Sequence, residues 1–166
     1  MLKTLILFVI NFILLAFFIV HAGINRTNIY ELNTPNDWKV KKNFFGSDFF
    51  ITAPLVADRE TSILYTTTYN KNIKKTEVFN FINRNLKEMS NEWKNIKVLS
   101  KYINKKGIYF VKFNFFDSKR SSNALGIIGI KPLKNKYIYI AFTNTEQSYK
   151  TYENTVDEII DSIKIL

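Results

Sequence analysis

Residues 109–115 carry the strongest alternating pattern in the chain, and this pattern constrains the fold more than any other feature. Every second residue from Tyr109 to Phe115 is large and apolar, and a period of two predicts a half-buried β-strand. The four residues before it, Asn104 to Gly107, are typical of a hairpin turn. Because consecutive strands joined by tight turns pair antiparallel, the sequence predicts an antiparallel sheet.

Other segments of strand character lie on both sides of this one. They supply two or three strands before the first helical segment and, with residues 109–115, four after it, so the sheet is expected to contain about six strands. These segments are rich in β-branched and aromatic residues, which fit a pleated, half-buried surface. They are residues 38–41, 49–55, 62–69, 96–102, 124–131 and 136–143. Polar turns, several with glycine or proline, separate them. The strands come in two groups, one before and one after a segment with a different period.

Two segments have the period of an amphipathic helix. The first runs from Glu77 to Trp93, with apolar residues every three or four positions and Thr76 as its N-cap. The second follows Thr145 near the C-terminus. Its apolar stripe is Tyr149, Tyr152, Val156, Ile159 or Ile160, and Ile163. Two helices packed on one or both faces of an antiparallel sheet give an α+β fold.

The N-terminus predicts export. Lys3 precedes an apolar run over residues 4–20, and Val20 and Ala22 are the small residues that a signal peptidase reads. Residues 1–22 are therefore interpreted as a signal peptide cleaved before Gly23, or as an uncleaved N-terminal membrane anchor, because the run also reaches the minimum length of a spanning helix. Either alternative exports the rest of the chain, to the periplasm or the medium. We expect a polar spacer over 23–36 and a single domain over 37–166.

Charge suggests anionic partners. The formal net charge is +10, and such a field attracts phospholipid head groups or acidic polysaccharide. The alternative is a solvated surface that happens to use lysine. Nucleic acid is not expected, because export separates it from the chain. The candidate contacts are Lys39, Lys41, Lys42, Lys71, Lys74, Lys75, Lys105 and Lys106.

Aromatic residues beside these lysines form a second candidate surface, which consists of Phe44, Phe45, Tyr137 and Tyr139. Exposed aromatic rings next to basic residues hold peripheral proteins at anionic lipid. A tyrosine-rich sheet face could also bind a partner, since an antiparallel sheet can leave one face open. The competing interpretation assigns alternate phenylalanines of residues 44–50 to the core. The sequence leaves both readings open.

Several chemistries are excluded by composition. There is no cysteine, and the one histidine, His21, lies in the export segment. The remaining chain therefore lacks nucleophile–histidine catalysis and the usual ligands of zinc or copper. The acidic pairs Asp58/Glu60 and Asp157/Asp161 are interpreted as turn and helix-surface residues. No cofactor, metal or enzymatic activity is expected.

Glycines interrupt the strand pattern of residues 124–131. Gly126 and Gly129 flank two isoleucines, with no lysine-threonine ending and no helix after them. They are therefore not a phosphate-binding loop. Glycines inside a strand mark a bulge or a close approach of neighbouring groups, and we expect one of these here.

The order of elements resembles the PsbP-like superfamily, which includes the exported DcrB-like proteins. The resemblance covers roughly residues 30–166 and rests on five markers. These are Trp38 after a turn, Ala53-Pro54 at a strand end, Trp93 near the end of the central helix, a meander over 107–143, and Asp161-Ser162-Ile163 at the final helix. The resemblance implies an α+β sandwich and a non-enzymatic accessory or binding protein, and it brings no catalytic residue.

Together these features predict an exported envelope accessory protein that contacts another envelope protein through its sheet face or loops. The alternative is a peripheral protein that binds anionic lipid or surface polysaccharide through lysine-rich loops. Salt separates the two, because binding driven by exposed charges weakens as ionic strength rises.

Overall fold

The computed structural model describes residues 23–54 and 62–166. The predicted export segment, with its possible membrane association through residues 4–20, lies outside these ranges, as do Asp58 and Glu60. In the part of the chain that is described, no helix has both the length and the apolar character needed to cross a membrane.

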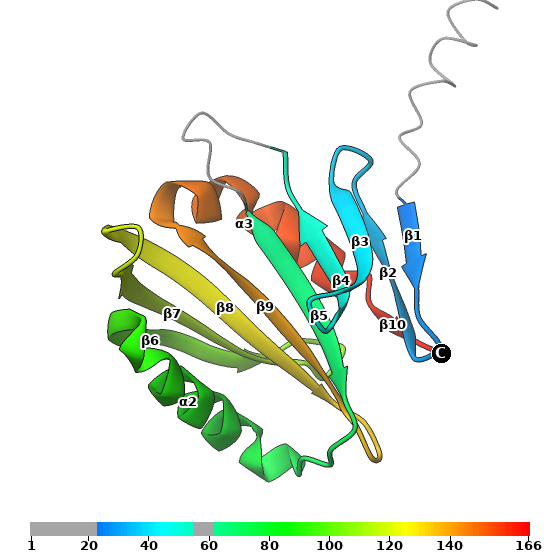
Figure 1. Ribbon diagram of the computed structural model, residues 1–166. Helices are drawn as coiled ribbons and strands as arrows, with labels where there is room; N and C mark the ends of the chain where they lie inside the picture. The colour runs from blue at the N-terminus through cyan, green and yellow to red at the C-terminus, as the bar shows by residue number, and fades with distance from the viewer. Residues whose placement is uncertain (1–22, 55–61) are drawn as a thin grey trace, which may run out of the picture.

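A seven-stranded sheet forms the centre of the fold, with every neighbouring pair antiparallel (Figure 1). Its spatial order is β3-β4-β5-β9-β8-β7-β6. The strands are β3 (Lys39–Phe44), β4 (Ser47–Thr52), β5 (Ile63–Tyr69), β6 (Trp93–Ile103), β7 (Tyr109–Asp117), β8 (Ser122–Pro132) and β9 (Tyr137–Thr145). The predicted α+β fold with an antiparallel sheet is confirmed, with more strands than the six expected.

Two helices cover opposite faces of this sheet. Helix α2 (Val78–Glu88) packs on the face that carries Val111 and Phe113 of β7. Helix α3 (Glu146–Asp161) packs on the other face, against Phe110 of the same strand. Successive side chains of a strand point to opposite faces, so the alternation around residue 110 supplies two separate apolar cores.

The first predicted helix is shorter than its apolar stripe. Short 3₁₀ turns, η1 (Lys75–Glu77) and η2 (Met89–Asn91), flank α2, and Trp93 begins β6. Thr76 is not the N-cap; Glu77 occupies that position and makes no side-chain capping bond. Trp93 fits the helical period by position, but its ring stacks on Phe115 with 4.3 Å between centroids. This contact with the sheet, and not the helical period, places Trp93 in β6.

Residues 23–34 are part of the fold, which differs from the expected spacer. Strands β1 (Gly23–Arg26), β2 (Tyr30–Thr34) and β10 (Lys164–Ile165) form a second, three-stranded sheet. Tyr30 and Leu32 are completely buried, and the Tyr30 hydroxyl lies 2.5 Å from the hydroxyl of Thr66 on β5. Only Glu31 separates Tyr30 from Leu32, and polar residues follow. The apolar alternation is therefore too short to reveal the strand in the sequence.

The glycines of β8 mark close packing, as expected. A Cβ at Gly126 would overlap the ring of Phe113 and lie 2.9 Å from Cγ2 of Thr143. A Cβ at Gly129 would lie 2.9 Å from Cδ1 of Phe110. Aromatic rings of β7 therefore lie across the backbone of β8, one ring on each face of the sheet.

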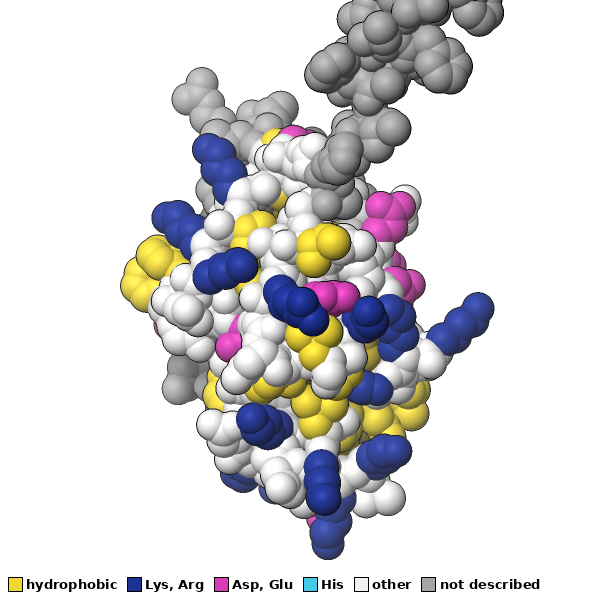
Figure 2. All heavy atoms as spheres, turned by 90° about the vertical axis from the view of Figure 1, so that its right-hand side faces the viewer, with side chains coloured by type: hydrophobic (Ala, Val, Ile, Leu, Met, Phe, Trp, Pro, Cys, Tyr) yellow, Lys and Arg dark blue, Asp and Glu magenta, His cyan; other side chains and the backbone are white. Residues whose placement is uncertain are grey.

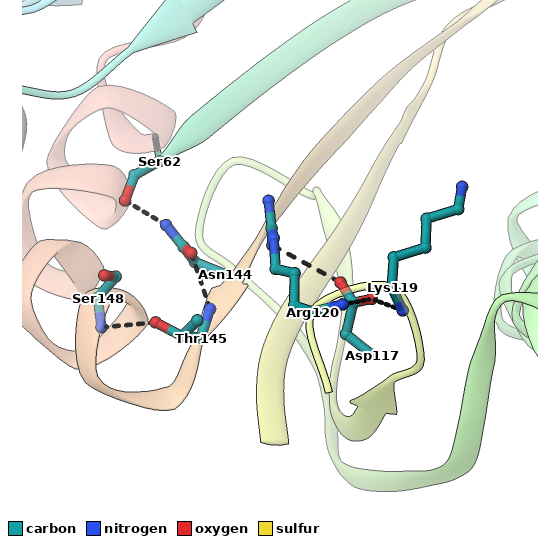
Figure 3. Close-up of polar contacts among 7 residues, drawn as sticks. All are labelled: Ser62, Asp117, Lys119, Arg120, Asn144, Thr145 and Ser148. Atoms are coloured by element: carbon teal, nitrogen blue, oxygen red, sulfur yellow. Dashed lines mark hydrogen bonds and ion pairs between the residues drawn. The ribbon is translucent and has the colours of Figure 1, made fainter. Parts of the chain in front are cut away.

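Polar side chains fix the start of α3 (Figure 3). Thr145 is the N-cap, as predicted, and its hydroxyl accepts a hydrogen bond from the backbone N–H of Ser148. Beside it, the buried Asn144 donates to the hydroxyl of Ser62 at the start of β5 and accepts from the backbone N–H of Thr145. These bonds connect β5, β9 and α3.

A second polar cluster in Figure 3 closes the turn between β7 and β8. Asp117 accepts hydrogen bonds from the backbone N–H groups of Lys119 and Arg120, at 2.9 and 3.2 Å. Arg120 also forms an ion pair with the same carboxylate at 3.7 Å. The turn also contacts the residue before β6, because Lys119 forms an ion pair with Glu92 at 2.8 Å and the backbone N–H of Ser118 donates to the Glu92 carbonyl oxygen at 3.4 Å.

Candidate functional site

Most of the candidate lysines gather at one end of the large sheet, which we call the basic end. The β3–β4, β6–β7 and β8–β9 turns and the segment between β5 and α2 meet there, as the strand registers require. It lies in the lower part of Figure 1, whereas strand β1 begins above it. Two candidates are exceptions: Lys39 pairs with Thr52 toward the other end, and Lys41 pairs with Phe50 between the two ends. The lysines of the basic end are Lys42, Lys71, Lys74, Lys75, Lys105, Lys106, Lys131, Lys134 and Lys136.

Charges crowd at this end. The ammonium group of Lys131 donates to the carbonyl oxygen of Lys106. Burial and the nearby charge of Lys75 together lower the pKa of Lys131. Among the described residues, no ion pair involves Lys71, Lys105 or the other candidate lysines. Figure 2 shows lysine and arginine side chains spread over an adjoining face with few acidic ones among them.

The phenylalanines near the β3–β4 turn divide between the two expected roles. Phe49 is completely buried and belongs to the core. Phe45 is 87% exposed at the tip of the hairpin, and its backbone is held at φ 49°. Phe44 is half-buried, with the ammonium group of Lys41 4.5 Å from its ring centroid. The candidate aromatic surface therefore keeps Phe45 and part of Phe44.

Tyr137 and Tyr139 are buried, which differs from their expected role as surface residues. They lie on the face covered by α2, where Phe81 packs 5.5 Å from the Tyr137 ring. Tyr139 stacks with Tyr65 at 5.9 Å, and burial raises its pKa. Tyr69, which stacks on Tyr137 at 5.0 Å, is exposed. The tyrosines form a stacked layer that mainly fills the core.

An open cleft of about 950 Å³ lies between α2 and β6, and sequence reasoning missed it. Leu86 of α2 and Trp93, Ile96 and Val98 of β6 supply its apolar lining. The helix contributes polar side chains spaced three or four residues apart, which place them on one flank of α2. The polar lining consists of Asn80, Asn83, Arg84, Lys87, Ser90, Lys94, Asn95 and Lys101.

The cleft is positively charged. Four of its lining residues are basic, two from α2 (Arg84 and Lys87) and two from β6 (Lys94 and Lys101), and none is acidic. The side-chain oxygen of Asn83 is buried in the wall without a hydrogen-bond partner among the described residues.

Strand β6 is an edge of the large sheet, since β7 is its only neighbour among the described strands. Apolar side chains along it are exposed to solvent. They are Val98 at 38%, Leu99 at 52%, Tyr102 at 37% and Ile103 at 52%. An exposed edge with apolar side chains is a template for pairing with another chain. The sequence could have indicated this edge, because too few residues of β6 are apolar at alternate positions for the strand to have a fully buried face.

The carboxylates of α3 have structural roles. Glu153 forms an ion pair with Lys112 of β7. Burial lowers the pKa of Lys112, but the hydrogen bond and charge of Glu153 outweigh this and raise it. Asp161 accepts a hydrogen bond from Asn104 at 3.2 Å, and burial raises the pKa of Asp157. In the described ranges, no group of three or more His, Cys, Asp or Glu residues could hold a metal ion.

Solved structures share this fold. No family model and no curated protein matches the sequence. The cyanobacterial PsbP protein CyanoP of Synechocystis sp. PCC 6803 is 12% identical, with a TM-score of 0.58 over 89% of this chain and 94% of that chain. LpqN of Mycobacterium tuberculosis, a protein involved in cell envelope biogenesis, is 13% identical, with a TM-score of 0.59 over 87% of this chain and 85% of that chain.

A Pseudomonas aeruginosa protein of unknown function is also similar. It is 11% identical, with a TM-score of 0.51 over 84% of this chain and 94% of that chain. Identities this low show the fold alone and carry over no activity or ligand. The likeness to CyanoP and LpqN extends over most of each chain, so the fold of this protein is PsbP-like, as its sequence predicted.

Proposed function

We propose that this chain is an exported, non-enzymatic accessory protein of the cell envelope that binds another envelope protein through the side formed by α2 and β6. The observation that carries the proposal is the cleft between these elements, continued by the exposed apolar side chains of β6. Specific interfaces combine an apolar centre with a polar rim. This side offers both.

Composition supports binding over catalysis. The chain beyond residue 22 contains neither cysteine nor histidine, so the common nucleophile–base pairs cannot form. Of the acidic residues of α3, Glu153 pairs with Lys112, Glu146 pairs with Lys150, and Asp161 accepts a hydrogen bond from Asn104. A protein with this inventory acts by holding a partner in place.

The envelope location rests on two supports. Residues 1–22 read as an export signal or an anchor, and LpqN, a protein of the same fold, takes part in cell envelope biogenesis. We place the chain in the periplasm or outside the cell, with retention in the inner membrane if residues 1–22 remain.

Site-specific crosslinking tests the proposal. A photoreactive amino acid replaces Val98, which lines the cleft and is 38% exposed on β6, in the full chain expressed in its native cells. We expect one protein adduct of reproducible mass from the envelope fraction. Asn135, exposed at the β8–β9 turn, is the matched control and should give no such adduct. The same adducts from both positions, or none from Val98, would contradict the proposal.

A second function has its own supporting observation, the convergence of lysines and the exposed Phe45 at the basic end. The chain would then bind anionic lipid or acidic polysaccharide there. Co-sedimentation with phosphatidylglycerol vesicles should fall as salt rises, because the Debye length shrinks from about 10 Å at 0.1 M to about 3 Å at 1 M. Lys71→Glu with Lys105→Glu should abolish it. Binding that withstands high salt or this double charge reversal would exclude this function.

A further inference from the structure

We propose that the α2–β6 cleft holds an extended, acidic segment of the partner protein, which runs along the free edge of β6. This inference rests on the function proposed above and adds the chemistry of the contact. Its basis is the charge, shape and hydrogen-bonding capacity of the cleft and of the strand beside it.

Charge selects an acidic occupant. Arg84 and Lys87 stand on the helix wall, and Lys94 and Lys101 stand on the strand wall, with no acidic residue in the lining. An acidic side chain between the walls can therefore pair with a basic group on either side. Pairs of this kind steer association and set the partner's register more than they add affinity.

Shape favours a polypeptide over a glycan. The apolar side chains of the cleft floor continue into Ile103 on the same face of the sheet. Leu99 is exposed on the opposite face of β6, where it lines a second pocket with Phe116 and Glu146. An extended peptide that alternates acidic and apolar residues covers both features at once, because its side chains point alternately to two sides. The hydroxyl groups of a polysaccharide would leave the apolar strip in contact with polar atoms.

The edge of β6 supplies the main-chain contacts. Pairing with β7 is irregular between Lys94 and Lys97 and between Val98 and Ser100, and regular from Ser100 to Ile103. Bulges and lysines of this kind discourage unselective pairing of an edge. The regular stretch still offers backbone N–H and C=O groups to an added strand, which is how edge strands recognise extended peptides.

Fluorescence anisotropy with labelled peptides tests this inference on the chain that begins at Gly23. The probe alternates Glu and Val over roughly ten residues, about the length of β6. A peptide that alternates Lys and Val is the control for charge. We expect the acidic peptide to bind and the basic peptide to fail. Equal binding of both, or of neither, would overturn the inference.

Paired variants locate the site. Arg84→Glu with Lys101→Glu reverses one charge on each wall and should weaken binding of the acidic peptide about ten-fold, as expected for two lost ion pairs plus repulsion. Lys71→Glu with Lys105→Glu changes the net charge equally at the basic end and should leave binding within about two-fold. If both double variants weaken binding equally, attraction is general and the cleft is not the site.

Two further measurements separate the alternatives. Methylation of alternate backbone nitrogens of the peptide removes donors to β6 and should weaken binding, whereas unchanged binding would refute strand pairing.

Competition with polygalacturonate tests the polysaccharide alternative, and the polymer should not displace the peptide. Displacement by polygalacturonate that carries the same total charge as the peptide would assign the cleft to a polysaccharide. A crosslinked adduct at Val98 together with a failed peptide test would overturn this inference and keep the proposed function. Absence of the adduct would overturn the function itself.

Discussion

At the scale of single residues, the glycines of β8 show how close the two central strands pack. Gly126 faces the ring of Phe113, which is completely buried and lies 5.7 Å from the ring of Trp93. The ring therefore has no free space into which it can rotate. The glycines alone predicted either a bulge or close packing, and their aromatic partners could not be assigned until the register of β7 and β8 was known.

Gly126→Ala should lower the free energy of unfolding by about 1–3 kcal/mol, the usual cost of inserting a methyl group into a packed core. The added Cβ would overlap Phe113 and approach Thr143. Urea denaturation followed by tryptophan fluorescence measures the change. Gly23→Ala is the control, since its Cβ would lie 3.6 Å from the Thr34 hydroxyl, an ordinary contact. Equal stability of Gly126→Ala and the parent chain would contradict the packing.

A pH-dependent change is expected at Asp157. Burial raises the pKa of this carboxyl, the charge of Lys112 lowers it, and the charges of Glu153 and Asp161 raise it further. A carboxyl with a raised pKa in the folded state stabilises the fold below its unfolded pKa, about 3.9, and loses this contribution as pH rises through the folded pKa.

Asp157→Asn should therefore make the chain more stable at pH 7, where the parent carboxylate is charged and partly desolvated. At about pH 3, where the parent carboxyl is protonated in both states, the two proteins should unfold at the same urea concentration. The acidic measurement serves as the control. A variant that is less stable at pH 7 would show that the pairing with Lys112 outweighs desolvation.

At the scale of elements, the sequence predicted those that are regular by themselves. Helix α3 matches its apolar stripe and its Thr145 cap, and β7 matches its alternation. The limits of α2 were predicted poorly because Trp93 continues the helical period, yet its ring stacks on Phe115 across the sheet. Such a contact depends on tertiary structure and leaves no local trace.

The cleft escaped prediction for a related reason. Its basic residues are separated along the chain by the 3₁₀ turn η2, so Arg84 and Lys101 become neighbours across a gap only after β6 turns back beside α2. The basic end was easier to anticipate, because turns that join adjacent antiparallel strands alternate between the two ends of a sheet. The composition predicted the positive charge of the protein, and the strand topology brings the lysines of the basic end together.

At the scale of the whole molecule, the N-terminal segment decides where the folded unit begins. Strand β2 pairs with β1 on one side and with the C-terminal β10 on the other, and it packs Tyr30 and Leu32 into the core shared with α3. The two ends of the described chain therefore meet in one small sheet. A fold closed in this way depends on residues that sequence alone had assigned to a spacer.

A chain that begins at residue 37 should lose cooperative unfolding, whereas the chain that begins at Gly23 should keep it. Removing a buried Leu side chain costs about 2–5 kcal/mol, and loss of Leu32 together with Tyr30 approaches the 5–15 kcal/mol that holds a typical domain together. Leu32→Ala in the longer chain separates packing from length: it should stay folded and lose about 2–5 kcal/mol in urea denaturation. If both chains unfold with the same cooperativity and at the same urea concentration, the domain is complete without β1 and β2.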